Sequence, residues 1–155
     1  MFLPTIRHIG NSNQFIFLER NDCMNREQLV ERAREIKVRS YSPYSKFPVG
    51  AAILMKDGRV FTGVNVENVS FGATNCAERT AIFTAITEGY KKGDFVEIAV
   101  NGNTEDFLPP CSICRQVMAE FFEPDLPVHL TNDKNEIHTL ALKELLPFAF
   151  TDLEM

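Results

Sequence analysis

The sequence lacks long apolar runs, an excess of basic residues and a dense set of cysteines, and each absence excludes a class of protein. The longest apolar run near the N-terminus, residues 15–18, is too short for a signal-peptide core or a membrane span. The net charge of -5 argues against a nucleic-acid-binding surface, which is normally basic. Four cysteines without a secretory signal make a disulfide framework a poor interpretation. We therefore expect a cytoplasmic protein with no membrane or nucleic-acid partner.

What is present is enough apolar sequence for one folded domain. The chain has 155 residues, of which 45% are hydrophobic and 24% charged. Residues 1–23 show no sustained periodicity and are expected to form a loosely ordered extension before a domain over residues 24–155. Apolar spacing and turn residues predict helices over residues 26–40, 76–87, 112–121 and 142–146, and strands over residues 49–55, 59–66, 95–100, 128–131 and 136–140. This order predicts a three-layer α/β/α sandwich with a five-stranded mixed sheet.

Two short motifs contain three of the four cysteines. Cys111 and Cys114 are three residues apart at a predicted helix start, so their side chains share one face. Cys76 lies at the start of another predicted helix, and both helix N-termini project partial positive charge toward the thiolates. Three thiolates can hold a zinc ion and leave its fourth position open, which is typical of catalytic zinc. The motifs therefore predict a catalytic zinc site.

Two residues beside Cys76 suit this chemistry. Glu78 could handle the protons of a metal-bound water, and Arg79, one turn after Cys76, is placed to donate to the thiolates from the second shell. The Cys-x-x-Cys pair alone would also fit a structural zinc or a redox couple. A structural zinc would need a fourth ligand, and the sequence has no histidine near either motif.

At these residues the chain resembles the small, homotetrameric, three-cysteine cytidine deaminases. The resemblance extends from about residue 24 to the tail, and its segments follow the family order: residues 42–52, 65–68, 75–81, 110–116 and 145–150. It implies the cytidine deaminase-like fold, a homotetramer, and one zinc ion per subunit bound by Cys76, Cys111 and Cys114. It also implies hydrolysis of cytidine and deoxycytidine to uridine and deoxyuridine with release of ammonia, in pyrimidine salvage.

The resemblance assigns further roles. As in zinc deaminases generally, Glu78 would take a proton from the zinc-bound water, protonate N3 of the cytosine ring and help ammonia leave. Phe47 would pack on the base, Ala77 would contact the substrate, and Asn65 and Glu67 would hold the ribose hydroxyls. Asn65 and Glu67 lie two apart at a strand end, so their side chains point the same way. Phe47 as a core residue and a solvated strand end remain alternatives.

Two aromatic residues would reach the active site of a neighbouring subunit, according to the same resemblance. Phe71 lies in a loop where many relatives carry tyrosine, so a hydroxyl is missing here. Phe150 lies in the tail, which could instead be docked on its own domain.

Other functions stay open at this point. One is a deaminase of a modified cytosine nucleoside or antibiotic, which the Asn65 and Glu67 pair disfavours. RNA editing is disfavoured by the acidic charge. A thiol-disulfide oxidoreductase would use Cys111 and Cys114 without Cys76, and a zinc-stabilised assembly protein would not need Glu78. The preference between ribose and deoxyribose and the role of Cys23 are not readable from the sequence.

Overall fold

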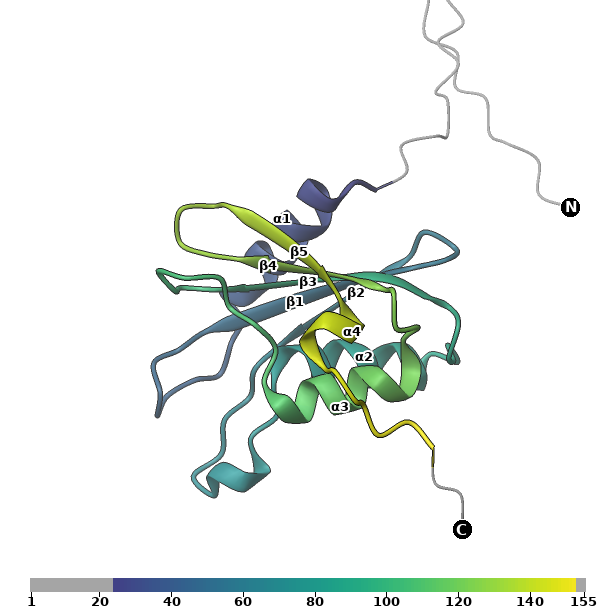
Figure 1. The fold of residues 1–155 in the computed structure, drawn as a ribbon. Helices are drawn as coiled ribbons and strands as arrows, with labels where there is room; N and C mark the ends of the chain where they lie inside the picture. Colours follow the sequence, from purple (N-terminus) through teal and green to yellow (C-terminus); the bar gives the residue numbers. More distant parts are fainter. Residues whose placement is uncertain (1–23, 153–155) are drawn as a thin grey trace, which may run out of the picture.

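The architecture is a single sheet covered by helices on both faces (Figure 1). The computed structural model describes residues 24–152. The sheet has five strands in the order β2-β1-β3-β4-β5, and the predicted three-layer sandwich with a mixed sheet is confirmed. The elements along the chain are α1 (Arg26–Lys37), β1 (Val49–Met55), β2 (Val60–Val64), the 3₁₀ turn η1 (Phe71–Ala73), α2 (Ala77–Thr87), β3 (Phe95–Gly102), α3 (Ser112–Phe121), β4 (Pro127–Thr131), β5 (Ile137–Ala141) and α4 (Leu142–Leu145).

Strand directions bring two helix starts to one edge of the sheet. Strand β1 pairs antiparallel with both β2 and β3, so β2 and β3 run in the same direction. Helix α2 follows β2 and helix α3 follows β3, and both helices lie on the same face of the sheet (Figure 1). The N-termini of α2 and α3 therefore meet near the carboxyl ends of these two strands, where open α/β sheets commonly bind ligands.

Successive side chains of the central strands point to opposite faces of the sheet, so the hydrophobic core is divided into two clusters, one on each face. Ala51 and Ile53 of β1 belong to the large cluster under α2, α3 and α4, whereas Ala52 packs under α1 with Leu29 and Ala33. This period of two is what a strand buried on both sides requires. Close packing of β1 against α1 requires a small residue: a Cβ atom at Gly50 would lie 2.1 Å from the Ala33 carbonyl oxygen.

A second close approach, between Gly63 of β2 and the first turn of α2, holds the start of this helix against the sheet. A Cβ atom at Gly63 would lie 2.3 Å from the Ala77 carbonyl oxygen and 2.5 Å from the Ala81 amide nitrogen, so any side chain there would displace the helix. The Thr80 hydroxyl also donates to the Val64 carbonyl at 3.0 Å. The first turn of α2 is thus held against β2 at a fixed depth.

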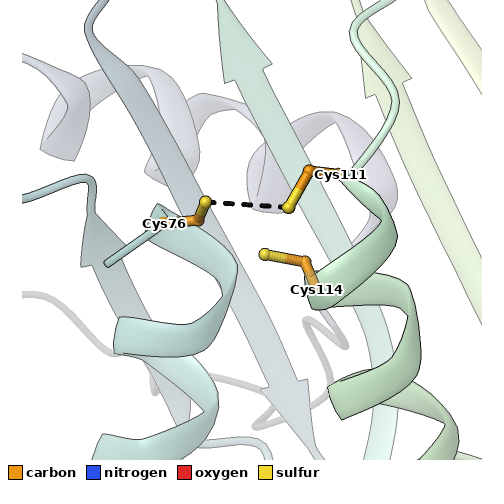
Figure 2. A group of neighbouring side chains, drawn as sticks. All are labelled: Cys76, Cys111 and Cys114. Atoms are coloured by element: carbon orange, nitrogen blue, oxygen red, sulfur yellow. Dashed lines mark hydrogen bonds between the residues drawn. The ribbon is translucent and has the colours of Figure 1, made fainter. Parts of the chain in front are cut away.

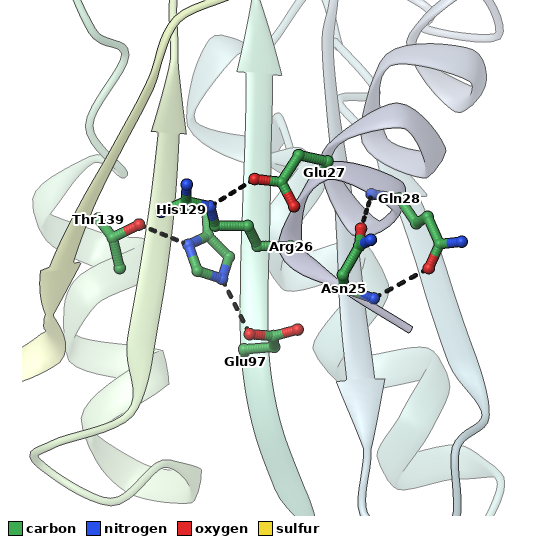
Figure 3. Close-up of polar contacts among 7 residues, drawn as sticks. All are labelled: Asn25, Arg26, Glu27, Gln28, Glu97, His129 and Thr139. Carbon is green, nitrogen blue, oxygen red and sulfur yellow. Dashed lines mark hydrogen bonds and ion pairs between the residues drawn. The ribbon is translucent and has the colours of Figure 1, made fainter. Parts of the chain in front are cut away.

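The opposite face begins with a capped helix (Figure 3). Asn25 is the N-cap of α1, and it forms a capping box with Gln28 through two hydrogen bonds of 2.9 Å. His129 of β4 is buried on this same face, with Nδ1 2.9 Å from Thr139 Oγ1 and Nε2 3.0 Å from Glu97 Oε2. His129 is therefore a core residue of the α1 face, away from the helix starts that bear the cysteines.

Several boundaries differ from those predicted. Strand β2 ends at Val64 instead of residue 66, because Val66 forms isolated bridges with Tyr41 and Asn75 in place of the ladder. Strand β3 continues to Gly102, past the predicted end at residue 100, and the 3₁₀ turn η1 was not predicted. The extension over residues 1–23, with Cys23, lies outside the described residues. Among residues 24–152, no helix is long and apolar enough to cross a membrane.

Candidate active site

Three sulfur atoms come together where the two helices begin (Figure 2). Cys76 is the N-cap residue of α2 and Cys111 that of α3, and neither side chain makes a capping hydrogen bond. Cys114, one turn into α3, is fully buried beneath them. The three Sγ atoms lie within 4.8 Å of one another, and those of Cys76 and Cys111 are 3.8 Å apart. The structure thus brings together all three predicted metal ligands.

The sulfur cluster fits a zinc ion. Tetrahedral coordination with Zn–S bonds of about 2.3 Å places ligand sulfurs about 3.8 Å apart, close to the separation of Cys76 and Cys111. Among the residues that the structure describes, no fourth His, Cys, Asp or Glu joins the set. A metal held here would keep one coordination position for another ligand, as catalytic zinc does.

Positive charge beside the cluster favours thiolates. Arg79 Nη2 lies 3.5 Å from Cys76 Sγ and also donates to the Thr74 carbonyl at 3.2 Å. Hydrogen bonding from the Cys114 thiol, followed by that from Arg79, lowers the pKa of Cys76 to about 5 despite partial burial. The same hydrogen bond between Cys114 and Cys76, together with burial, raises the pKa of Cys114. The lowered pKa favours the thiolate form of Cys76, which is the form that binds a metal ion.

Glu78 lies in the wall of the same cavity and is only 4% exposed. Burial is the main cause that raises its pKa to about 7, and the negative charge of Cys76 adds to it. A carboxyl group with a pKa near 7 can both accept and donate a proton at neutral pH. This property suits proton transfer beside an open metal position.

A cavity of about 240 Å³ opens in front of Cys76 and Cys111. Cys114 and Arg79 do not line it. Phe71 lines the cavity of its own chain, and Phe150, 64% exposed, does not reach it; the Phe150 carbonyl instead accepts a hydrogen bond of 2.7 Å from Gln116. The remaining predicted site residues line the cavity: Phe47, Asn65, Glu67, Ala77 and Glu78.

Asn65 is held by the loop that it faces. Its Oδ1 accepts from the Ser40 hydroxyl at 2.6 Å and the Val49 amide at 2.8 Å, and its Nδ2 donates to the Phe47 carbonyl at 2.9 Å. A side-chain amide offers two acceptor sites and two donor hydrogens, so one Nδ2 hydrogen remains for a ligand. Asn65 is 8% exposed, which argues against a solvated strand end.

Glu67 is a second buried carboxylate, 5% exposed, whereas the intervening Val66 is 45% exposed. Both predicted side chains therefore point inward, as their spacing indicated. The amides of Tyr44 and Ser45 donate to Glu67 Oε2 at 2.9 and 3.1 Å, and the Ser45 hydroxyl donates to Oε1. Burial opposes ionisation, but these hydrogen bonds outweigh it and lower the pKa of Glu67, so the group is a fixed anion.

Other lining residues were missed by sequence reasoning. Ser45 lies inside a segment that resembles the family, but nothing in the sequence links its hydroxyl to Glu67, twenty-two positions away. Leu108 and Pro109 close the cavity after β3, and Gly102 makes room for this: a Cβ atom there would lie 2.5 Å from Leu108 Cδ2. Two consecutive prolines at 109 and 110 are typical of a loop, but they do not indicate that this loop forms a wall of the cavity.

Taken together, the α/β sandwich and a cavity that joins three sulfur ligands to a buried carboxyl group define a class of metal-dependent enzymes for small polar molecules. The sequence profile described as the cytidine and deoxycytidylate deaminase zinc-binding region matches residues 24–129. The chain belongs to this family, the cytidine deaminases.

Individual relatives agree over nearly the whole domain. The chain is 50% identical over 132 residues to the cytidine deaminase of Halalkalibacterium halodurans, covering 85% of this chain and 98% of the relative. It is 45% identical over 128 residues to that of Sporosarcina psychrophila, covering 83% and 93%. The crystal structure of cytidine deaminase from Burkholderia pseudomallei superposes with a TM-score of 0.80 at 48% identity, covering 82% of this chain and 100% of that one. These matches disfavour the oxidoreductase and assembly-protein alternatives.

Proposed function

We propose that the protein hydrolyses cytidine and deoxycytidine to uridine and deoxyuridine with release of ammonia, in pyrimidine salvage. The observation that supports this most is the buried Glu78 beside an open three-sulfur site. The same cavity holds polar groups suited to a sugar. The three free thiols must stay reduced to bind metal, so we also propose a reducing, cytoplasmic location.

The metal site consists of Cys76, Cys111 and Cys114 with one zinc ion per subunit. Arg79, which does not line the cavity, stabilises the thiolates through its hydrogen bond to Cys76. When bound, zinc lowers the pKa of a water molecule toward neutrality and so supplies a nucleophile. Glu78 would accept one proton from the attacking water and pass it to N3 of the cytosine ring. It would then take the proton of the new hydroxyl at C4 and deliver it to the amino group, so that ammonia leaves as the C4 carbonyl forms. Its pKa of about 7 allows both directions of transfer.

The substrate is positioned by the other cavity residues. Phe47 packs on the base, and the free Nδ2 hydrogen of Asn65 and the Glu67 carboxylate hold sugar hydroxyls. Ala77 is the first residue of α2, so its amide hydrogen has no intrahelical acceptor and is free for the substrate. The pair of Asn65 and Glu67 favours a nucleoside over a substrate without a sugar.

We further propose that the protein works as a homotetramer. Large apolar side chains are exposed on α2, α3, η1 and the tail: Phe71, Phe83, Ile113, Phe148 and Phe150. A second copy could cover them and receive Phe71 or Phe150 near its own cavity. Light scattering should then give a mass four times that of the 17.6 kDa chain.

The central test compares wild type with Glu78→Gln, measuring cytidine loss by ultraviolet absorbance and zinc content on both. We expect the variant to keep its zinc and to lose about 10³-fold in kcat, since proton transfer by a positioned group is worth about 10² to 10⁴. Glu120→Gln, on the exposed side of α3, is the matched control and should be fully active. Zinc-loaded wild type that leaves cytidine and deoxycytidine untouched would overturn the substrate assignment and direct the search to modified nucleosides.

A further inference from the structure

We propose that Ser45 is a positioning residue whose hydroxyl fixes the Glu67 carboxylate and the Phe47 backbone in one arrangement, so that the sugar and base contacts are set together. The inference rests on the proposed function and concerns how the same cavity selects a nucleoside. Ser45 touches neither the sulfur cluster nor Glu78 through any hydrogen bond of the described structure.

Two hydrogen bonds determine the direction of the Ser45 hydroxyl. The Phe47 amide donates to Ser45 Oγ at 3.0 Å, and Ser45 Oγ donates to Glu67 Oε1. A hydroxyl has a single proton, and an ionised carboxylate can only accept, so the donor role of Ser45 toward Glu67 is fixed. The hydroxyl therefore joins the residue proposed to hold the sugar to the residue proposed to pack on the base.

The backbone of the loop is shaped for this connection. Lys46 has a positive φ of 58°, and its amide donates to the Ser42 carbonyl at 3.1 Å. This left-handed residue turns the chain so that the Phe47 amide points back at the side chain two residues earlier, a turn that serine hydroxyls favour. Ser45 itself is exposed, so it fills no space in the core.

The Glu67 carboxylate accepts three hydrogen bonds from the loop, and the one from the Ser45 hydroxyl is the bond that Oε1 accepts. Oε2 accepts two backbone amides, from Tyr44 and Ser45, which use both of its acceptor sites. Oε1 accepts the Ser45 hydroxyl and keeps one site for a ligand hydroxyl. Without the Ser45 hydroxyl, the backbone amides would still hold Oε2, but nothing would fix the direction of the remaining site on Oε1.

The test is the kinetics of Ser45→Ala with two substrates, cytidine and 2′,3′-dideoxycytidine. For cytidine we expect KM to rise about tenfold with kcat within about twofold, because a binding contact equal in ground and transition states is weakened. For the dideoxynucleoside, which has no ring hydroxyl for Glu67 to hold, KM should rise by only about twofold, because only the Phe47 contact with the base is then weakened. Ser45→Thr keeps a hydroxyl and should restore KM for cytidine.

Two further variants separate positioning from general damage to the loop. Ser42→Ala removes a hydroxyl from the same loop whose one side-chain hydrogen bond in the described structure is with Ser40, and it should leave KM unchanged. In the Glu67→Gln background, Ser45→Ala should add less than about a twofold change, since coupled residues are not additive.

An equal rise of KM on both substrates would overturn the proposal, as would a loss of zinc or kcat in Ser45→Ala, because Ser45 would then only maintain the fold. Inactivity of wild type toward cytidine would instead contradict the proposed function, so the two failures are distinguishable.

Discussion

The two walls of the cavity are built by different means. The sulfur wall, consisting of Cys76, Cys111 and Glu78 with the buried Cys114 behind them, sits on two helix starts that the core and a close helix–sheet approach hold in place. The polar wall, consisting of Ser45, Asn65 and Glu67, is held by hydrogen bonds between side chains and loop backbone.

This contrast predicts different failures. Loss of a group from the sulfur wall should remove the chemistry without reshaping the sugar site. Loss of a group from the polar wall should weaken substrate binding and local stability while leaving the metal bound. The variants below test this separation, beginning with the largest expected effect.

The strongest test removes a sulfur ligand. Cys114→Ala should abolish zinc binding and reduce turnover about 10³-fold or more, because two remaining thiolates do not complete a catalytic zinc site. Zinc content and cytidine turnover, measured together, check this. Ser112→Ala, at an exposed position of the same helix turn, is the control and should keep both. A Cys114→Ala protein with full zinc and activity would mean that the sulfur cluster is not the metal site.

An intermediate effect is expected in the polar wall. Asn65→Ala leaves the Val49 amide and the Phe47 carbonyl without partners, so we expect a loss of about 2 kcal/mol or more in the free energy of unfolding, given about 1 to 3 for each unsatisfied group. KM for cytidine should also rise while zinc content stays at one per chain. Denaturant unfolding of this variant beside Asn103→Ala, an exposed asparagine, measures the difference. Equal stability of the two variants would contradict the structural part played by Asn65.

The smallest effect concerns Lys46, the left-handed residue between Ser45 and Phe47. Lys46→Gly removes a Cβ atom from a residue with φ of 58°, which should raise the free energy of unfolding by about 0.5 kcal/mol after the entropic cost of glycine is subtracted. Zinc content should not change. Lys92→Gly, an exposed lysine without positive φ, should instead lower stability slightly. If both glycine variants lose stability, the loop is not strained at Lys46.

The same contrast explains what could be read from the sequence. The sulfur wall follows from local patterns: helix α3 was predicted with the bounds that the structure has, Ser112–Phe121, and Cys111 precedes it as N-cap. The common direction of the Asn65 and Glu67 side chains followed from their spacing at a strand end, and their burial in the structure shows that this direction is inward.

Other parts of the site depend on tertiary contacts and have no local signal. The bond from Ser45 to Glu67 joins two loops that only the folded chain brings together. The early end of β2 reflects the bridges that Val66 makes to Tyr41 and Asn75, which compete with the strand ladder. The expectation that Phe71 serves a neighbouring subunit remains a prediction, although the residue also lines the cavity of its own chain.

The close approach at Gly63 has a consequence for redesign of this enzyme. Cys76 precedes the helix turn that rests on Gly63, whereas Cys111 and Cys114 belong to a separate helix, so the depth of α2 on the sheet helps to set the separation of the sulfurs. A library that varies the cavity for new nucleosides can therefore sample the side chains of the polar wall at a cost in stability but without loss of the metal, because within the described structure none of them forms a hydrogen bond with Cys76, Cys111 or Cys114. The same library should keep position 63 constant, although this buried glycine lies outside the cavity lining and so would not be recognised as part of the site.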